Sequence, residues 1–136
     1  MFPTSQDSPL VLVVDDEQSV LDDVSAALGA DGFRCTLCTS SADALAQALA
    51  EPPELIISDI NLHGHSGLEM CEEIKANVEL RDVPVMFLSG AQIPDIIRRS
   101  HAVGGTYYLR KPFDPEVLVE LVHKALYMPH LAAAHR

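Results

Sequence analysis

Apolar residues fall in short blocks along this chain. The first, LVLVV, covers residues 10–14 without interruption, which is typical of a strand that is buried on both faces of a sheet. Four further strand-like segments cover residues 33–38, 54–58, 83–89 and 104–110. The pattern therefore predicts five strands in a packed domain.

Between and after these runs, apolar residues recur every three or four positions, which is typical of helices that bury one face. The segments with this pattern are 18–30, 40–50, 66–77, 93–103 and 115–127. Ser40 or Ser41 is a suitable N-cap for the second helix, and Gly32 is a suitable stop after the first. Strands that alternate with helices predict an α/β fold, in which helices cover both faces of a parallel sheet.

The pattern also divides the chain into parts. Residues 1–8 are polar and proline-containing and predict a flexible N-terminal lead. Residues 9–127 contain all five strand–helix units and are long enough for one domain. Residues 128–136 are expected to be a C-terminal tail or the start of a linker.

Charge and composition exclude several classes of function. The net charge of −11 opposes contact with a phosphate backbone, so we expect no direct nucleic-acid binding. No apolar run approaches the roughly 20 residues that span a bilayer, and the start MFPTSQDS lacks a basic leader, so we expect a cytoplasmic protein without a membrane segment. Cys35 and Cys38 are three residues apart on a strand and face opposite sides, so we expect them and Cys71 to pack in the core.

Polar side chains that could take part in catalysis or binding lie at four of the predicted strand ends. Asp15 and Asp16 follow the first strand, Asp59 follows the third, Ser89 closes the fourth and Lys111 follows the fifth. In an open parallel sheet, ligands bind at the carboxyl ends of the strands, so these side chains should lie close together. The second strand ends without such a residue, and we expect it at the edge of the sheet.

This set of residues suggests phosphoryl chemistry. Three neighbouring carboxylates repel one another unless a cation lies among them, and oxygen ligands favour Mg²⁺. Asp59 can attack phosphorus as a nucleophile. Lys111 can pair first with the carboxylate and later with the phosphoryl group, and the Ser89 hydroxyl can donate to a phosphoryl oxygen.

Four short motifs hold these residues: VVDDE, IISDIN, VMFLSG and LRKPF. With them, the chain from about Leu10 to Leu126 resembles the receiver domains of two-component response regulators, and its spacing is similar to that of single-domain chemotaxis regulators. The resemblance implies a flavodoxin-like, doubly wound sheet of five parallel strands in the order 2-1-3-4-5 with five flanking helices.

The resemblance also implies a role for each site residue. Asp59 is the phosphoacceptor, Asp16 binds Mg²⁺ directly with Asp15 assisting, and Asp59 and the backbone carbonyl of Asn61 complete the protein ligands. The Lys111-Pro112 peptide bond is implied to be cis.

The implied switch joins Ser89 to Tyr108. Phosphorylation draws the Ser89 hydroxyl toward the phosphoryl group, and Tyr108 turns into the space left behind. This change alters the face built by the fourth helix, fifth strand and fifth helix. His63 stands where the family often has proline, and we expect it and His65 to be exposed loop residues.

The expected partners are a sensor histidine kinase or a histidine phosphotransfer protein upstream, and an effector protein or an output domain downstream. The sequence leaves open whether phosphorylation leads to a homodimer. The chain is not expected to be an enzyme beyond its own phosphotransfer and autodephosphorylation. The alternatives are a pseudo-receiver that docks proteins without phosphate and a hydrolase with an aspartyl nucleophile, whose first-strand D-x-D motif and cap domain this chain lacks.

Overall fold

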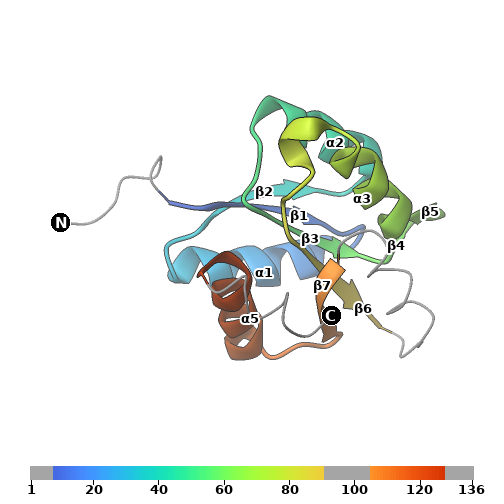
Figure 1. Cartoon of the computed structure of the whole chain (residues 1–136). Coiled ribbons are helices and arrows are strands. Elements are labelled where there is room, and N and C mark those ends of the chain that lie inside the picture. Colours follow the sequence, from blue (N-terminus) through green and yellow to red (C-terminus); the bar gives the residue numbers. More distant parts are fainter. Residues whose placement is uncertain (1–7, 91–104, 128–136) are drawn as a thin grey trace.

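The computed structural model describes residues 8–90 and 105–127, and the described part contains one five-stranded sheet (Figure 1). Its strands are β1 (Leu10–Val14), β2 (Arg34–Cys38), β3 (Leu55–Asp59), β6 (Val85–Ser89) and β7 (Gly105–Arg110). They pair in the order β2-β1-β3-β6-β7, and every pairing is parallel. The predicted α/β fold and the implied strand order 2-1-3-4-5 are confirmed, with the second strand at an edge.

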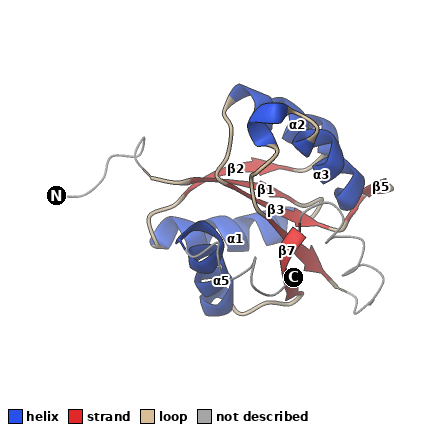
Figure 2. Cartoon of the chain, viewed as in Figure 1, coloured by secondary structure: helices blue, strands red, loops and turns tan. Residues whose placement is uncertain are grey.

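Four α-helices of the described part cover the two faces of this sheet (Figure 2). Helices α1 (Gln18–Ala30) and α5 (Pro115–Tyr127) lie on one face, and α2 (Ser41–Ala50) and α3 (Gly67–Lys75) lie on the other. The helix expected over 93–103 and the tail 128–136 lie outside the described residues. None of the described helices has the length and apolar character needed to cross a bilayer.

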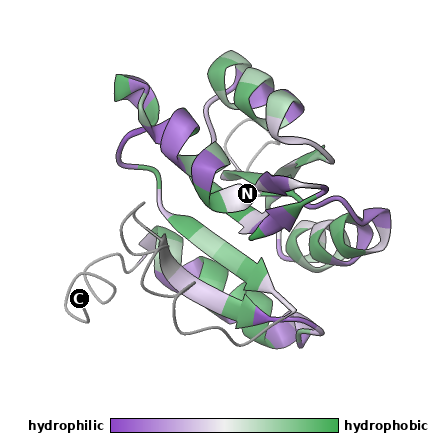
Figure 3. Cartoon of the chain, turned by 90° about the vertical axis from the view of Figure 1, so that its right-hand side faces the viewer, coloured by the Kyte–Doolittle hydropathy of each residue, from purple (hydrophilic) through white to green (hydrophobic). Residues whose placement is uncertain are grey.

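Figure 3 shows hydrophobic residues on the strands of the sheet, which separates two apolar layers. Alternate residues of β1 point into opposite layers. Val11 and Val13 pack toward α1 and α5, whereas Leu12 and Val14 pack toward α2 and α3. All four side chains are essentially inaccessible to solvent. Burial on both faces is the reason why β1 appears as a continuous apolar run, whereas the edge strand β2 contains polar residues and is mostly half-buried.

Serine side chains cap the N-termini of two helices. Ser40 Oγ accepts a hydrogen bond of 3.2 Å from the backbone N–H of Asp43 at the start of α2. Ser66 Oγ accepts one of 3.2 Å from Glu69 N–H at the start of α3. Of the two serines considered for α2, Ser40 is therefore the N-cap. Gly32 adopts a φ of 89° just after α1, as expected of a helix stop.

The segment after β3 differs from expectation. A short hairpin of β4 (Asn61–Leu62) and β5 (His65–Ser66) precedes α3, and a 3-10 turn, η1 (Val78–Leu80), follows it. The helix expected over 66–77 is thus shorter. Strands of two residues show no periodicity, and the hairpin turn depends on the positive φ angles of His63 (43°) and Gly64 (80°).

The three cysteines are free and belong to the core layers. Cys35 packs toward α1 and α5, whereas Cys38 and Cys71 pack on the other side of the sheet. Burial raises the pKa of Cys35 to about 11 and that of Cys71 to about 12, although Lys75 lowers the latter. These thiols stay protonated at neutral pH, and the predicted core role is confirmed.

Candidate functional site

The carboxyl edge of the sheet brings together four side chains that are remote in sequence. Asp15 and Asp16 directly follow β1, and Asp59 is the last residue of the neighbouring strand β3. Lys111 directly follows β7, two strands further along the sheet. The expectation that Asp59 comes after its strand was wrong by one residue, because the strand's hydrogen bonding to β6 includes the Asp59–Leu88 pair.

Lys111 is the centre of this group. Its Nζ lies 2.8 Å from Asp15 Oδ2, 2.8 Å from Asp59 Oδ2 and 3.7 Å from Glu17 Oε1. The Lys111 backbone N–H donates a 2.8 Å hydrogen bond to the Ser89 carbonyl, which fixes the start of the side chain. The Lys111-Pro112 peptide bond is cis, as the resemblance implied.

Asp15 is a buried carboxylate with incomplete hydrogen bonding. Its Oδ1 accepts a 2.9 Å hydrogen bond from the Glu17 backbone N–H. Its Oδ2 is buried and makes no well-formed hydrogen bond, although the Lys111 ammonium lies 2.8 Å away. Burial raises the pKa of Asp15 above its ordinary value, and the contacts with Lys111 and Glu17 N–H offset only part of that rise.

The pKa of Lys111 is shifted in the direction that keeps it charged. Burial by itself would lower this pKa, because desolvation disfavours the ammonium. The close contacts with Asp15 and Asp59, together with the negative charges of these two carboxylates, outweigh burial and raise the pKa of Lys111. Lys111 is therefore a fixed cation at neutral pH, held against the carboxylate that was predicted to be the nucleophile.

The acidic side chains have the geometry of a divalent-cation site. One ligand atom from each of Asp15, Asp16, Glu17 and Asp59 lies within 4.8 Å of the others. The donors are all carboxylate oxygens, which suit a hard cation such as Mg²⁺, and the buried Asp15 Oδ2 still lacks a hydrogen bond. The predicted metal residues that are carboxylates thus fit a divalent cation, and Glu17 joins them.

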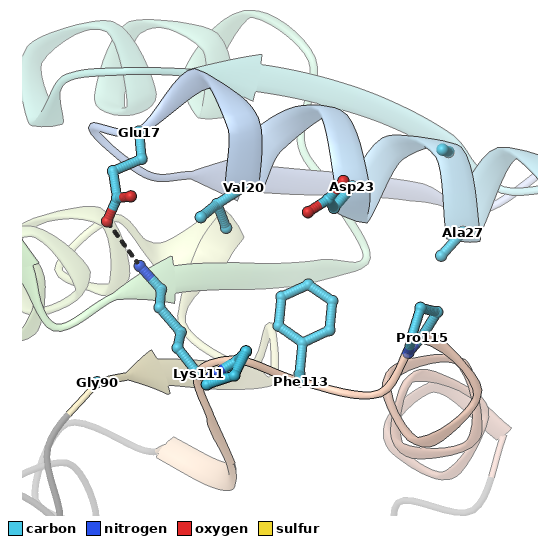
Figure 4. Close-up of a pocket in the computed structure, with 10 residues that line it drawn as sticks. Glu17, Val20, Asp23, Ala27, Gly90, Lys111, Phe113 and Pro115 are labelled. Carbon is cyan, nitrogen blue, oxygen red and sulfur yellow. Dashed lines mark ion pairs between the residues drawn. The ribbon is translucent and has the colours of Figure 1, made fainter.

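Glu17 was missed from the sequence as a member of this group. It directly follows the two aspartates in VVDDE, so an acidic neighbour of the pair was visible. Its distance from Lys111 depends on how α1 begins and on how the segment after β7 runs past it (Figure 4). Only the tertiary structure shows that its carboxylate turns toward the site.

The segment after Asp59 holds that residue from its other side. The Asn61 backbone N–H donates a 3.1 Å hydrogen bond to Asp59 Oδ1, opposite the Lys111 contact with Oδ2. Gly67 packs directly against the Asp59 backbone, since a Cβ at Gly67 would lie 2.0 Å from the Asp59 carbonyl oxygen. A side chain at this position would displace Asp59, so the glycine is required by space.

His63 lies against Asp16 at the rim of the site. Its backbone N–H donates a 3.1 Å hydrogen bond to Asp16 Oδ2, and its ring Nδ1 is 3.5 Å from the same oxygen. The His63 side chain is nevertheless 83% exposed, and His65 is exposed as well. The expectation of exposed loop histidines is confirmed for both, and for His63 the contact with Asp16 is an addition.

Ser89 lies on β6, the strand next to that of Asp59, and Tyr108 lies on β7, one strand further along the sheet. Ser89 is the last residue of β6, one position beyond the Leu88 that pairs with Asp59, and it is partly buried. Tyr108 is half-buried and packs toward the α2 and α3 layer, whereas Tyr107 packs toward α1 and α5. The two tyrosines thus face opposite sides of the strand.

A cavity of about 860 Å³ opens beside Lys111, between α1 and the segment that joins β7 to α5 (Figure 4). Val20 and Ala27 from α1 face Phe113 and Pro115 across it, and Glu17 lies at the end nearest Lys111. Glu17 and Lys111 therefore line this cavity and also belong to the acidic site.

Known proteins share both this fold and these motifs. The family model described as "Response regulator receiver domain" matches residues 11–123. The phosphate regulon transcriptional regulatory protein PhoB of Pseudomonas aeruginosa is 31% identical over 109 residues, which are 80% of this chain and 48% of PhoB. The transcriptional regulatory protein PrrA of Mycobacterium tuberculosis is 36% identical over 119 residues, which are 88% of this chain and 49% of PrrA.

One solved structure is similar to this chain over nearly the whole of its own length. The chemotaxis response regulator CheY4 of Vibrio cholerae aligns with a TM-score of 0.84 and 30% identity, covering 88% of this chain and 99% of CheY4. By contrast, the chain spans about half of PhoB and PrrA. The match over most of its length, together with the carboxylates and lysine at the sheet edge, shows that this chain belongs to the response regulator receiver domain family.

Proposed function

We propose that Asp59 accepts a phosphoryl group and that this chain is the phosphoacceptor part of a two-component response regulator. The observation that carries the proposal is the position of Lys111, whose Nζ lies 2.8 Å from both Asp59 Oδ2 and Asp15 Oδ2. A cation held between a reactive carboxylate and a buried one can follow negative charge as it moves from Asp59 to a phosphoryl group.

In the proposed reaction, a carboxylate oxygen of Asp59 attacks the phosphorus of a phosphohistidine. A P–O bond forms and the P–N bond breaks, while the histidine nitrogen keeps the bonding electron pair and takes up a proton. Asn61 N–H and Lys111 Nζ hold the two Asp59 oxygens before the attack. Afterwards, Lys111 and the Ser89 hydroxyl pair with phosphoryl oxygens.

The cation in this proposal is Mg²⁺, with Asp16 and Asp59 as direct ligands, Asp15 assisting and the Asn61 carbonyl completing the protein ligands. When bound, Mg²⁺ would offset the negative charge of both reactants and orient the phosphoryl oxygens. Four carboxylates within 4.8 Å of one another support this assignment, as does the buried Asp15 Oδ2 that lacks a hydrogen bond.

The proposed output is a change of surface. Ser89 would move toward the phosphoryl group and Tyr108 would turn inward, which shifts the face around β7 and α5 between two states. The half-buried position of Tyr108 on β7 supports such a movement. The proposed phosphodonor is a sensor histidine kinase or a histidine phosphotransfer protein, which this chain would meet in the cytoplasm. The changed face would contact an effector, an output domain or a second copy.

Acetyl phosphate and Mg²⁺ provide the direct test, with the phosphorylated form resolved on a phosphate-affinity gel. We expect the parent protein to be phosphorylated and Asp59→Asn to lose the modified band completely. Asp82→Asn removes an exposed carboxylate from the turn before β6 and serves as the matched control, which should react like the parent. Equal labelling of Asp59→Asn and the parent would exclude Asp59 as the acceptor.

The second candidate is an adaptor that binds proteins without carrying phosphate. The acidic group and Lys111 speak against it, because protein docking alone does not require four carboxylates gathered within 4.8 Å of one another around a lysine. The adaptor would be favoured if neither acetyl phosphate nor a phosphorylated histidine protein modified the parent.

A further inference from the structure

The Glu17 side chain belongs to the acidic site but does not stabilise the start of α1. It is the N-cap residue of α1, but its carboxylate makes no capping hydrogen bond. Its backbone N–H serves the fold by donating to Asp15 Oδ1, and any amino acid other than proline would supply the same donor. The side chain is 62% exposed and still turns toward Lys111, with Oε1 3.7 Å from Nζ.

The position of Glu17 adds a fourth negative charge to the site. Its carboxylate lies within 4.8 Å of ligand atoms of Asp15, Asp16 and Asp59, whereas Lys111 is the cation that contacts three of these four residues. Four carboxylates and one ammonium leave an excess of negative charge at the site, and Glu17 and Lys111 of this group also line the cavity (Figure 4). Such a field attracts a divalent cation and repels an anionic reactant.

We propose that Glu17 is a charge-selecting residue of the phosphorylation site, which tightens binding of the divalent cation and slows the entry of small anionic phosphodonors. The inference rests on the proposed function, since it concerns the cation and the phosphodonor of that site. Glu17 competes for Lys111 with the incoming phosphoryl oxygens, and its own charge opposes theirs. A donor that carries less negative charge is therefore favoured over a free dianion.

The two effects of Glu17 have opposite signs, which separates them from simple damage to the site. Removing the charge with Glu17→Gln should weaken Mg²⁺ binding but speed the reaction with an anionic donor once Mg²⁺ is saturating. A loss of structure would weaken both. Because the side chain is largely exposed, each change should be modest, about two- to fivefold.

Two donors of different charge make the test sharper. Acetyl phosphate is a dianion at neutral pH, whereas phosphoramidate carries a single net negative charge. In both reactions an Asp59 oxygen bonds to phosphorus, and acetate or ammonia leaves with the electron pair of the broken bond. We expect Glu17→Gln to speed phosphorylation by acetyl phosphate about two- to fivefold and by phosphoramidate less, and added salt should reduce both gains.

The controls are Glu54→Gln and Glu17→Asp. Glu54 is exposed and directly precedes β3, at the opposite edge of the sheet from Asp59, so its substitution changes the net charge equally but far from the site. Glu17→Asp keeps the charge and should stay closer to the parent than Glu17→Gln. Mg²⁺ dissociation constants from titration calorimetry provide the readout that does not depend on phosphorylation.

The proposal is supported if Glu17→Gln weakens Mg²⁺ binding and accelerates acetyl phosphate while Glu54→Gln changes neither. It is overturned if Glu17→Gln matches Glu54→Gln, if both quantities fall together, or if the two donors respond equally. These outcomes leave the role of Asp59 untouched, because that role is decided by whether Asp59→Asn loses the modified band.

Discussion

The middle of the central strands and their carboxyl ends obey opposite rules. In the middle of β1 and β3, residues such as Val13 and Ile57 are inaccessible to solvent and pack against other apolar side chains. At the ends of the same strands, Asp15 and Asp59 are also buried, but they are charged and face one lysine. Both regions are thus buried. Apolar contacts surround the strand interiors, whereas the strand ends depend on charge pairing with Lys111.

This difference shows which region stabilises the fold and which region destabilises it. Apolar burial stabilises the fold in proportion to the area removed from water. A buried carboxylate destabilises the fold, because burial removes its charge from water, and the same desolvation raises the pKa of Asp15. The strand interiors therefore hold the strand ends in an arrangement that their charges alone would not keep.

The largest expected effect on the free energy of unfolding comes from a substitution in the apolar interior of a strand. Phe87 lies on β6, is fully buried and is among the largest buried side chains, so Phe87→Ala should leave a cavity and lower the free energy of unfolding by about 3–5 kcal/mol. Urea denaturation measures the change. Val78→Ala, which truncates an apolar side chain that is 73% exposed, should cost less than about 0.5 kcal/mol. Similar losses for both would refute this account of the core.

The next effect falls on the contact that holds Asp59 in place. Gly67→Ala would put a Cβ 2.0 Å from the Asp59 carbonyl oxygen, a backbone atom with little freedom to retreat. We expect a loss of about 1–3 kcal/mol in unfolding free energy, together with slower phosphorylation, because Asp59 must shift.

Gly29→Ala on α1 is the matched glycine substitution. A Cβ there meets nothing within 4 Å, so alanine should be neutral or stabilising by up to about 1 kcal/mol. If Gly67→Ala were as well tolerated as Gly29→Ala, in stability and in phosphorylation, the close approach at Asp59 would not restrict the residue at position 67.

A smaller effect with the opposite sign tests the charged side. In a chelator, Asp15→Asn should raise the unfolding free energy by about 1 kcal/mol, because it removes a buried charge while Lys111 keeps Asp59 as a partner. Added Mg²⁺ should stabilise the parent more than the variant, since a cation that binds the folded state stabilises it by mass action. Asp82→Asn should behave like the parent in both conditions, and a destabilised Asp15→Asn in chelator would contradict the comparison.

The smallest effect appears as a dependence on pH. The pKa of Lys111 is raised above its ordinary value of 10.5 by Asp15 and Asp59, which outweigh the opposing effect of burial. The stabilisation from charged Lys111 is therefore fully present below pH 10.5 and is lost as the pH rises through the higher pKa of the folded state. The unfolding free energy of the parent should fall over this alkaline range by more than that of Lys111→Gln. Parallel curves would show that the lysine is not coupled to the carboxylates.

Much of the fold could be predicted because strand and helix periods are local properties of the sequence. The five strand-like segments became the five strands of the sheet, and the absence of a candidate site residue after the second segment placed β2 correctly at the edge. The short hairpin of β4 and β5 could not be predicted in the same way. Two-residue strands carry no period, and the positive φ of His63 is imposed by the surrounding loop and by its N–H contact with Asp16.

The candidate site was predicted as a set of residues but not as a geometry. Asp15, Asp16, Asp59 and Lys111 could be chosen because parallel strands place their carboxyl ends on one edge. That Lys111 lies 2.8 Å from two carboxylates, and that Gly67 leaves no room for a side chain beside Asp59, are distances between segments far apart in the chain. No local pattern contains such distances.

By itself, the sequence determined the type and order of the elements and the chemical nature of the groups at the strand ends. The tertiary structure alone decided which oxygen of each carboxylate meets Lys111, that Asp15 Oδ2 is left without a hydrogen bond, and that Glu17 belongs to the acidic group. The physical reason is that hydrophobic periodicity depends on neighbours along the chain, whereas charge–charge energies and desolvation depend on distances through space.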